Sequence, residues 1–206
     1  MEKYPVVDTS GKKVGEIELN PSIFGFESRP DLVHDVVVWQ RNCARRGTHD
    51  CIHKGEMEAS SKKPYKQKGT GRARAGGVDS PLWVGGAVAH GPRPRSYETR
   101  VTKRRRKEGL FSVLSDKVRE KKLVVIDSFG IESPKTKSME KILKNVCQGS
   151  ALVVADSDRV PVGVSTRNLK FAKYLDVAGV NTYDLLKKEY FVCSKEALEK
   201  LQKEIA

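Results

Sequence analysis

A basic segment rich in glycine carries the residues whose types and spacing suit a specific chemistry. From Lys62 to Gly77 the sequence reads K-K-P-Y-K-Q-K-G-T-G-R-A-R-A-G-G, with four lysines, two arginines and no acidic residue. Lys and Arg neutralise phosphates and release counterions, and Arg adds planar bidentate hydrogen bonds. Glycines let the backbone approach a polyanion closely and bring N–H groups to phosphate oxygens. This pattern indicates a nucleic-acid-binding segment.

Two further stretches extend the same pattern. His90–Arg95 combines Arg93 and Arg95 with rigid prolines, and Lys103–Lys107 is an unbroken basic run. The basic run opens a predicted helix, where cations oppose the helix dipole, so we expect it to bind phosphate. The aromatic rings of Tyr65 and Trp83 are suited to stacking on unpaired bases.

The positive charge of the chain is confined to one region. The 206 residues carry a formal net charge of +13. Arg41 to Lys107 contains 18 Lys and Arg and 5 Asp and Glu, which accounts for all of that excess, while the rest is balanced at 21 of each. A neutral body with one highly charged segment is typical of nucleic-acid-binding proteins.

The elements outside this region predict an α/β fold with a mostly parallel sheet flanked by helices. Continuous apolar runs read as strands buried on both faces, and they alternate with amphipathic segments that read as helices. A small β element is expected at 3–20. Helices are expected at 31–46, 103–121, 135–146, 168–175, 183–188 and 195–205, and strands at 123–126, 151–155, 177–180 and 190–193.

The domain organisation follows from the same pattern. Residues 47–102 lack apolar periodicity and are interrupted by glycines and prolines. A loop this long within a compact domain is expected only where it is functional or disordered alone. We therefore predict one globular domain, 1–46 with 103–206, into which an extended basic RNA-binding loop, 47–102, is inserted.

Other functions fit the sequence less well. Cys43, His49, Cys51 and His53 are zinc-compatible residue types, but their spacing matches no common structural zinc site. Asp127, Asp156 and Asp158 follow predicted strands without a partner His, Lys or metal cluster, so an RNA-directed enzyme would need a pocket there. A free-standing regulator would need a stable site on a short nucleic acid. We expect no catalytic residue, no metal and no cofactor.

The cysteines and the lengths of the apolar runs indicate the cellular compartment. The four cysteines form no C-x-x-C pair, which favours reduced thiols. The first residues lack the charged and apolar regions of a secretory signal, and no apolar run approaches about 18 residues. We therefore expect a cytoplasmic protein that does not contact membrane.

The order of motifs resembles a known family. K-K-P-Y-K-Q-K-G-T-G-R-A-R-A-G, followed by S-P-L-W at 80–83 and G-P-R-P-R at 91–95, is similar to the loop of the bacterial-type ribosomal protein L-four family. The order of the surrounding elements is also similar, so the resemblance covers nearly the whole chain. The family commonly has Trp-Arg where this chain has Tyr65-Lys66, and often Arg at Val84.

The resemblance implies a structural role in the large ribosomal subunit. Its loop would bind 23S-type rRNA, support subunit assembly and help line the nascent-polypeptide exit tunnel. Implied partners are large-subunit rRNA, neighbouring ribosomal proteins and the nascent polypeptide. The tunnel-lining tip would comprise Gln67, Lys68, Gly69 and Thr70. The full set of expected RNA-binding residues is Lys62, Lys63, Tyr65, Lys66, Gln67, Lys68, Gly69, Thr70, Gly71, Arg72, Arg74, Trp83, Arg93, Arg95, Lys103, Arg104, Arg105 and Arg106.

Overall fold

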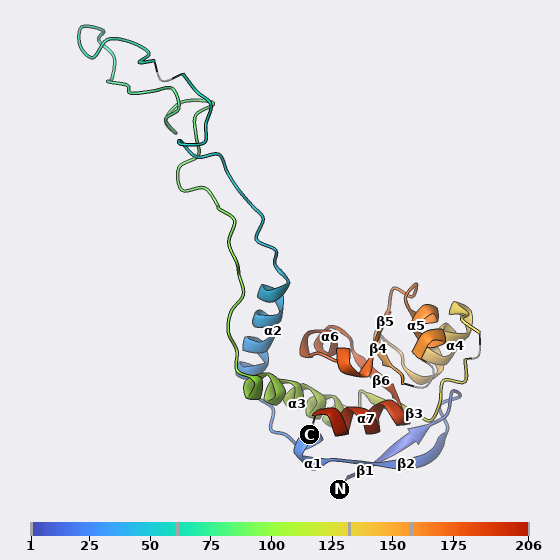
Figure 1. Ribbon diagram of the computed structural model, residues 1–206. Coiled ribbons are helices and arrows are strands. Elements are labelled where there is room, and N and C mark those ends of the chain that lie inside the picture. The colour runs from blue at the N-terminus through green and yellow to red at the C-terminus, as the bar shows by residue number, and fades with distance from the viewer. Residues whose placement is uncertain (1, 61, 132, 157–158, 206) are drawn as a thin grey trace. The chain divides into compact units, whose positions relative to one another are not determined.

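The computed structural model describes residues 2–60, 62–131, 133–156 and 159–205 (Figure 1). Asp158, one of the carboxylates considered above, lies outside the described residues. Contacts between Cα atoms divide the chain into two compact units. One comprises Met1–Arg41 with Arg100–Ala206, and the other is Asn42–Thr99. We call them the α/β unit and the inserted unit.

The α/β unit is built on a six-stranded sheet in the order β2-β1-β3-β6-β4-β5. Only β2 runs antiparallel to its neighbour, and β1 with β2 forms the small β element expected near the start of the chain. This arrangement confirms the predicted α/β fold with a mostly parallel sheet. The strands are β1 Glu2–Val7, β2 Lys13–Leu19, β3 Leu123–Ile126, β4 Ala151–Val154, β5 Ala172–Leu175 and β6 Tyr190–Ser194.

Helices cover both faces of the sheet. Successive residues of a strand point to opposite faces, and in the central strands the residues on both faces are apolar. On β3, Leu123 and Val125 belong to one buried cluster, which includes residues of α3 and α7, and Ile126 belongs to another, which includes residues of α4 and α5. The helices are α1 Pro21–Phe24, α2 Pro30–Ala44, α3 Lys103–Arg119, α4 Thr136–Val146, α5 Arg159–Thr166, η1 Val177–Gly179 (a 3-10 turn), α6 Thr182–Lys187 and α7 Lys195–Ile205.

Two predicted elements after β4 are wrong. The helix expected at 168–175 is instead the strand β5, and the helix precedes it as α5. The strand expected at 177–180 is the 3-10 turn η1. The sequence did not predict α5 because it contains Pro161 and Gly163, which are unfavourable within helices. The proline lies in the first helical turn, where its missing N–H breaks no hydrogen bond.

The α2 and α3 helices approach each other closely at one point near the start of α3. A Cβ atom on Gly109 of α3 would lie 2.9 Å from Cγ2 of Val36 on α2. Both residues are buried. The glycine therefore permits the two helices to approach at the turn that follows the basic run. Among the described residues, no helix is both long and apolar enough to cross a membrane.

Candidate nucleic-acid interface

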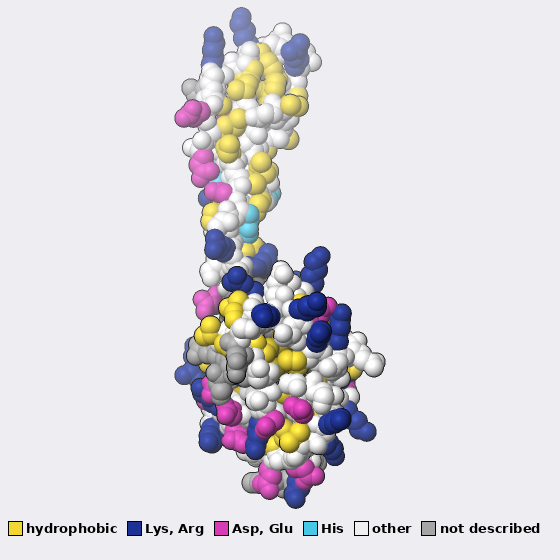
Figure 2. Space-filling view, turned by 90° about the vertical axis from the view of Figure 1, so that its right-hand side faces the viewer, with side chains coloured by type: hydrophobic (Ala, Val, Ile, Leu, Met, Phe, Trp, Pro, Cys, Tyr) yellow, Lys and Arg dark blue, Asp and Glu magenta, His cyan; other side chains and the backbone are white. Residues whose placement is uncertain are grey.

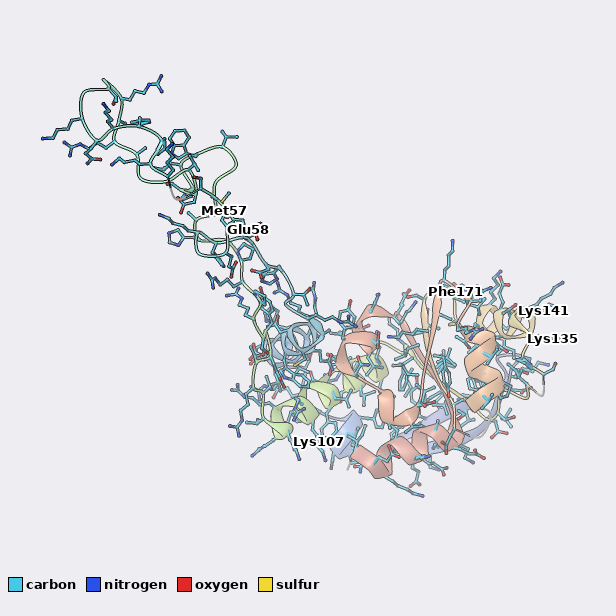
Figure 3. All side chains as sticks on the ribbon, turned by 45° about the horizontal axis from the view of Figure 1, so that its top comes forward. Met57, Glu58, Lys107, Lys135, Lys141 and Phe171 are labelled. Carbon is cyan, nitrogen blue, oxygen red and sulfur yellow. The ribbon has the colours of Figure 1, made fainter. Side chains whose placement is uncertain are left out.

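The inserted unit contains no regular secondary structure in its described residues beyond the last turn of α2. Figure 2 shows Lys and Arg side chains, in dark blue, projecting from the far end of this unit. In Figure 3 long nitrogen-tipped side chains project outward from the end that lies beyond Met57 and Glu58. The sequence places Lys62–Arg74, which we call the basic segment, next along the chain.

The basic segment exposes all six of its cations. Among the described residues, none of their side chains has a carboxylate within ion-pair distance. Exposed cations without a carboxylate partner can exchange counterions for phosphates with no ion pair to break. The cations are Lys62, Lys63, Lys66, Lys68, Arg72 and Arg74.

Local hydrogen bonds and glycine conformations shape this segment. The Tyr65 hydroxyl donates to the carbonyl of Ala73, and the Lys63 ammonium donates to the side-chain oxygen of Gln67. Gly69 and Gly71 have φ values of +84° and +62°, a region that favours glycine. Apart from the adjoining residues, no atom lies within 4 Å of where their Cβ atoms would be, so the backbone at both glycines is open to a ligand.

An aromatic cluster that sequence reasoning missed joins the two ends of the inserted unit. The guanidinium carbons of Arg45 and Arg95 lie 3.8 Å and 4.7 Å from the centroid of the Tyr97 ring, within cation–π range. The Tyr97 hydroxyl lies 3.0 Å from Nε2 of His49. The Arg95 N–H also donates to the carbonyl of Gly47 at 3.2 Å. No spacing rule relates residues this far apart in sequence, so only the structure reveals the cluster.

Trp83 belongs to a separate, hydrogen-bonded turn. The Trp83 N–H donates to the carbonyl of Ser80, and the Gly86 N–H donates to the carbonyl of Trp83, both at 3.0 Å. Arg93 and Arg95 are both exposed, and the guanidinium of Arg95 lies against the Tyr97 ring. The predicted aromatic and arginine residues therefore lie in different local settings within this unit.

The basic run at the start of α3 lies in the α/β unit. Thr102 caps the helix by accepting a hydrogen bond from the Arg105 N–H at 3.4 Å. Lys103 and Arg105 are exposed, while Arg104 pairs with Glu108 at 2.7 Å. These three cations crowd the positive end of the helix, where an anion would be stabilised.

Two further cations of this run make contacts inside the α/β unit. The Arg106 guanidinium lies 4.6 Å from the Trp39 ring centroid, and its Nε is buried without a hydrogen-bond partner among the described residues. Lys107, labelled in Figure 3, donates to the carbonyl of Ile205 at 3.1 Å. Arg106 therefore helps to hold α3 against α2, whatever else it contacts.

The alternative sites gain no support from the described residues. No group of three or more His, Cys, Asp or Glu side chains there is placed to hold a metal ion. Past the end of β4 a cavity of about 90 Å³ is lined by Asp156, Asp176 and Lys200 among others, and Lys200 pairs with Asp156 at 2.8 Å. Pockets for small ligands typically have volumes of about 300–1,000 Å³, so this cavity is too small for a nucleotide.

Comparison with known proteins shows the family of the chain. Residues 17–204 match the model of the family described as "Ribosomal protein L4/L1 family". The chain is 44% identical to the large ribosomal subunit protein uL4 of Heliobacterium modesticaldum, 42% to that of Desulfitobacterium hafniense and 41% to that of Moorella thermoacetica, each over all of both chains. These are ribosomal proteins, not enzymes, in agreement with the sequence-based expectation. The chain belongs to the ribosomal protein L4/L1 family.

Proposed function

We propose that this protein is a structural constituent of the large ribosomal subunit in the cytoplasm and binds 23S-type rRNA through an extended loop, residues 47–102. The loop supports subunit assembly. Its tip, Gln67–Thr70, helps line the exit tunnel and meets the nascent polypeptide. Neighbouring ribosomal proteins complete its surroundings.

The observation that carries this proposal is the set of six exposed cations on the basic segment, none of which has a carboxylate partner among the described residues. Their charge attracts the phosphate backbone, and the open Gly69–Gly71 backbone allows close approach. The two arginines supply planar donors, whereas Lys66 supplies charge alone.

The loop boundaries draw support from the contact pattern. The inserted unit has its own contacts, and no described residue from 45 to 102 lies in a helix or strand. A segment with so few buried apolar side chains gains little from folding alone, so it orders most fully on its partner. In this proposal the α/β unit provides the rigid support, and the exposed Lys103 and Arg105 add phosphate contacts at the start of α3.

Cosedimentation with large subunits tests the rRNA-binding role. The full chain and a Ser60–Arg95 deletion are expressed in the source cells, and their content in large subunits washed at high salt is measured. The full chain should be stoichiometric, and the deletion should lose protection of rRNA against chemical probes. A full chain that remains outside the particles, or a deletion that protects rRNA as the full chain does, contradicts the proposal.

The tunnel role needs its own measurement. A photoreactive side chain in place of Gln67 should crosslink to a stalled nascent chain in translating ribosomes. The same group in place of Lys12, which is exposed on the α/β unit, serves as the control and should give no such product. Crosslinking from both positions, or from neither, would remove the tunnel from the proposal while leaving rRNA binding intact.

A further inference from the structure

Two arginines from distant parts of the inserted unit contact one aromatic ring. The guanidinium carbons of Arg45 and Arg95 lie 3.8 Å and 4.7 Å from the centroid of the Tyr97 ring. Since both distances end at one centroid, the two carbons are less than about 10 Å apart, which is the screening length at 0.1 M salt. The two positive charges, which we call the arginine pair, therefore act on the same small region.

The protein leaves the arginine pair without a counter-charge. Both side chains are exposed, and among the described residues neither guanidinium has a carboxylate within ion-pair distance. Asp50 and Glu98 are the acidic residues nearest to the pair in the sequence. The Asp50 carboxylate instead accepts a hydrogen bond from the Cys51 N–H at 2.8 Å. Like charges this close repel each other, and an anion that contacts both removes the repulsion.

Backbone and side-chain contacts hold this arrangement together. The Arg95 N–H donates to the carbonyl of Gly47 at 3.2 Å, and Gly47 has a φ value of +63°. A Cβ atom there would lie 2.0 Å from the Arg95 carbonyl oxygen, so the two segments meet this closely only because residue 47 is glycine. The Tyr97 hydroxyl lies 3.0 Å from Nε2 of His49, which restrains the ring. A site formed before its ligand arrives loses less entropy on binding.

The donors of the arginine pair are available to a ligand. A cation–π contact uses the charge of a guanidinium and does not occupy its five N–H donors. Among the described residues, no acceptor takes up a side-chain donor of Arg45 or Arg95. The planar fork of these donors matches two oxygens of a phosphate or a carboxylate.

The neighbouring charges favour a polyanion over a single carboxylate. Arg46 follows Arg45, and Arg93 lies two residues before Arg95. Both are exposed, and among the residues that the structure describes neither has an ion-pair partner. A nucleic-acid strand carries one phosphate per nucleotide, so one phosphate can meet the pair while adjacent phosphates meet these neighbours. A lone Asp or Glu of a protein would leave the neighbours unmatched.

We propose that Arg45 and Arg95 together bind one phosphate of rRNA, and that Tyr97 is the positioning residue that holds both guanidiniums for it. This inference rests on the proposed function, because it takes rRNA as the ligand. It adds a binding residue, Arg45, that precedes the loop of residues 47–102, and it gives Tyr97 a role that charge alone does not supply.

The salt dependence of binding tests whether the two arginines share a phosphate. Filter binding of the full chain to isolated large-subunit rRNA compares wild type with Arg45→Gln plus Arg95→Gln. Affinity at 0.1 M salt should fall by about tenfold, because charge-assisted bidentate hydrogen bonds are strong. The slope of log affinity against log salt should fall by about 0.7 to 0.9, the value for one phosphate, and not by twice that amount. Arg167→Gln plus Lys170→Gln, at exposed positions of the α/β unit, should leave both quantities unchanged.

Ethylation of individual rRNA phosphates identifies the bound group directly. One ethylated phosphate that impairs binding of the wild type should no longer impair binding of either Arg45→Gln or Arg95→Gln. Interference lost at two different phosphates, or at none, would overturn the shared site. A slope that is unchanged, or lowered by about 1.4 or more, would overturn it as well.

Two substitutions of Tyr97 test its positioning role. Tyr97→Phe keeps the ring and should bind rRNA as the wild type does. Tyr97→Leu should lose interference at the same phosphate as the arginine variants, and should cost no further affinity when Arg45 and Arg95 are already glutamine. A merely structural role predicts weaker binding without loss of interference at that one phosphate. That result, or a Tyr97→Phe variant as weak as Tyr97→Leu, contradicts the positioning role.

The outcomes separate this inference from the function beneath it. If the wild type binds rRNA and Arg72→Gln with Arg74→Gln weakens it, while the Arg45 and Arg95 variants bind as the wild type does, the shared site fails and the proposed function stands. If the wild type shows no preference for rRNA, both fail.

Discussion

Replacing Arg72 and Arg74 with glutamine should lower the salt dependence of rRNA binding by a calculable amount. Both side chains are exposed and, among the described residues, neither has an ion-pair partner. Their removal therefore breaks no internal contact. Glutamine keeps length and hydrogen-bonding capacity while removing the charge, so the change reports on counterion release.

The expected magnitude follows from the number of charges. Each neutralised phosphate adds about 0.7 to 0.9 to the slope of log affinity against log salt concentration. Two arginines should therefore contribute about 1.4 to 1.8 to that slope. Over a fivefold rise in salt, the wild type should lose about 10- to 20-fold more affinity than the variant.

Filter binding of the full chain to isolated large-subunit rRNA, over a salt series, measures the slope. Lys12→Gln with Lys13→Gln removes the same charge from exposed positions of the α/β unit and serves as the matched control. The control slope should equal that of the wild type. Equal slopes for wild type and the Arg72 and Arg74 variant would refute the assignment. An equal reduction in the control would show that net charge alone, not the basic segment, sets the affinity.

Two further perturbations test the contacts that support the interface. Tyr97→Leu removes the ring beside Arg45 and Arg95, each cation–π contact being worth about 0.5–1 kcal/mol, so hydrogen exchange of 42–99 in the free protein should accelerate. Burial alone would raise the pKa of Asp184, but hydrogen bonds from Lys173 (2.6 Å) and a neighbouring amide outweigh it and hold that pKa below its usual value. A carboxylate whose pKa is lower in the folded than in the unfolded protein stabilises the fold at pH values above its unfolded-state pKa. Asp184→Asn should therefore lower the free energy of unfolding by its largest amount at pH 7, and this loss should shrink as the pH falls below about 4.

The controls for these two measurements lie in the same chain. Exchange within 123–126 should be unaffected by Tyr97→Leu, because β3 is the centre of the other unit. For Asp184→Asn, urea unfolding at several pH values gives the free energies. A cost that is independent of pH would show that the carboxylate charge contributes nothing to stability.

Sequence patterns identified the sheet where continuous apolar runs mark strands buried on both faces. The strands at 123–126 and 190–193 are confirmed to within one residue. The strand order was not predictable, because β6 inserts between β3 and β4. Parallel strands with uniformly apolar residues carry no register or neighbour signal of their own.

The error around α5 has a specific packing origin. A Cβ atom on Gly163 would lie 3.2 Å from the ring of Tyr174, so the glycine lets α5 pack on β5. The hydroxyl of Thr166 donates to the carbonyl of Val162 at 2.7 Å, which satisfies a polar group that is otherwise buried. Glycine and β-branched residues lower helix propensity, so local propensity placed the helix at 168–175 instead of 159–166. The packing of α5 on β5 outweighs that local preference.

Some features of the candidate interface could be predicted from local sequence, and others depend on contacts between distant residues. The charge of the basic segment and the glycines at 69 and 71 are local, and the sequence displays them directly. The Tyr97 cluster depends on two distant segments of the unit meeting, and the turn at 80–86 depends on Gly86 closing against Ser80. Sequence composition therefore predicted that the inserted unit meets a polyanion. The contacts that shape the unit join residues far apart in the sequence, such as Arg45 with Tyr97 and Lys54 with Asp79, so only the folded chain reveals them.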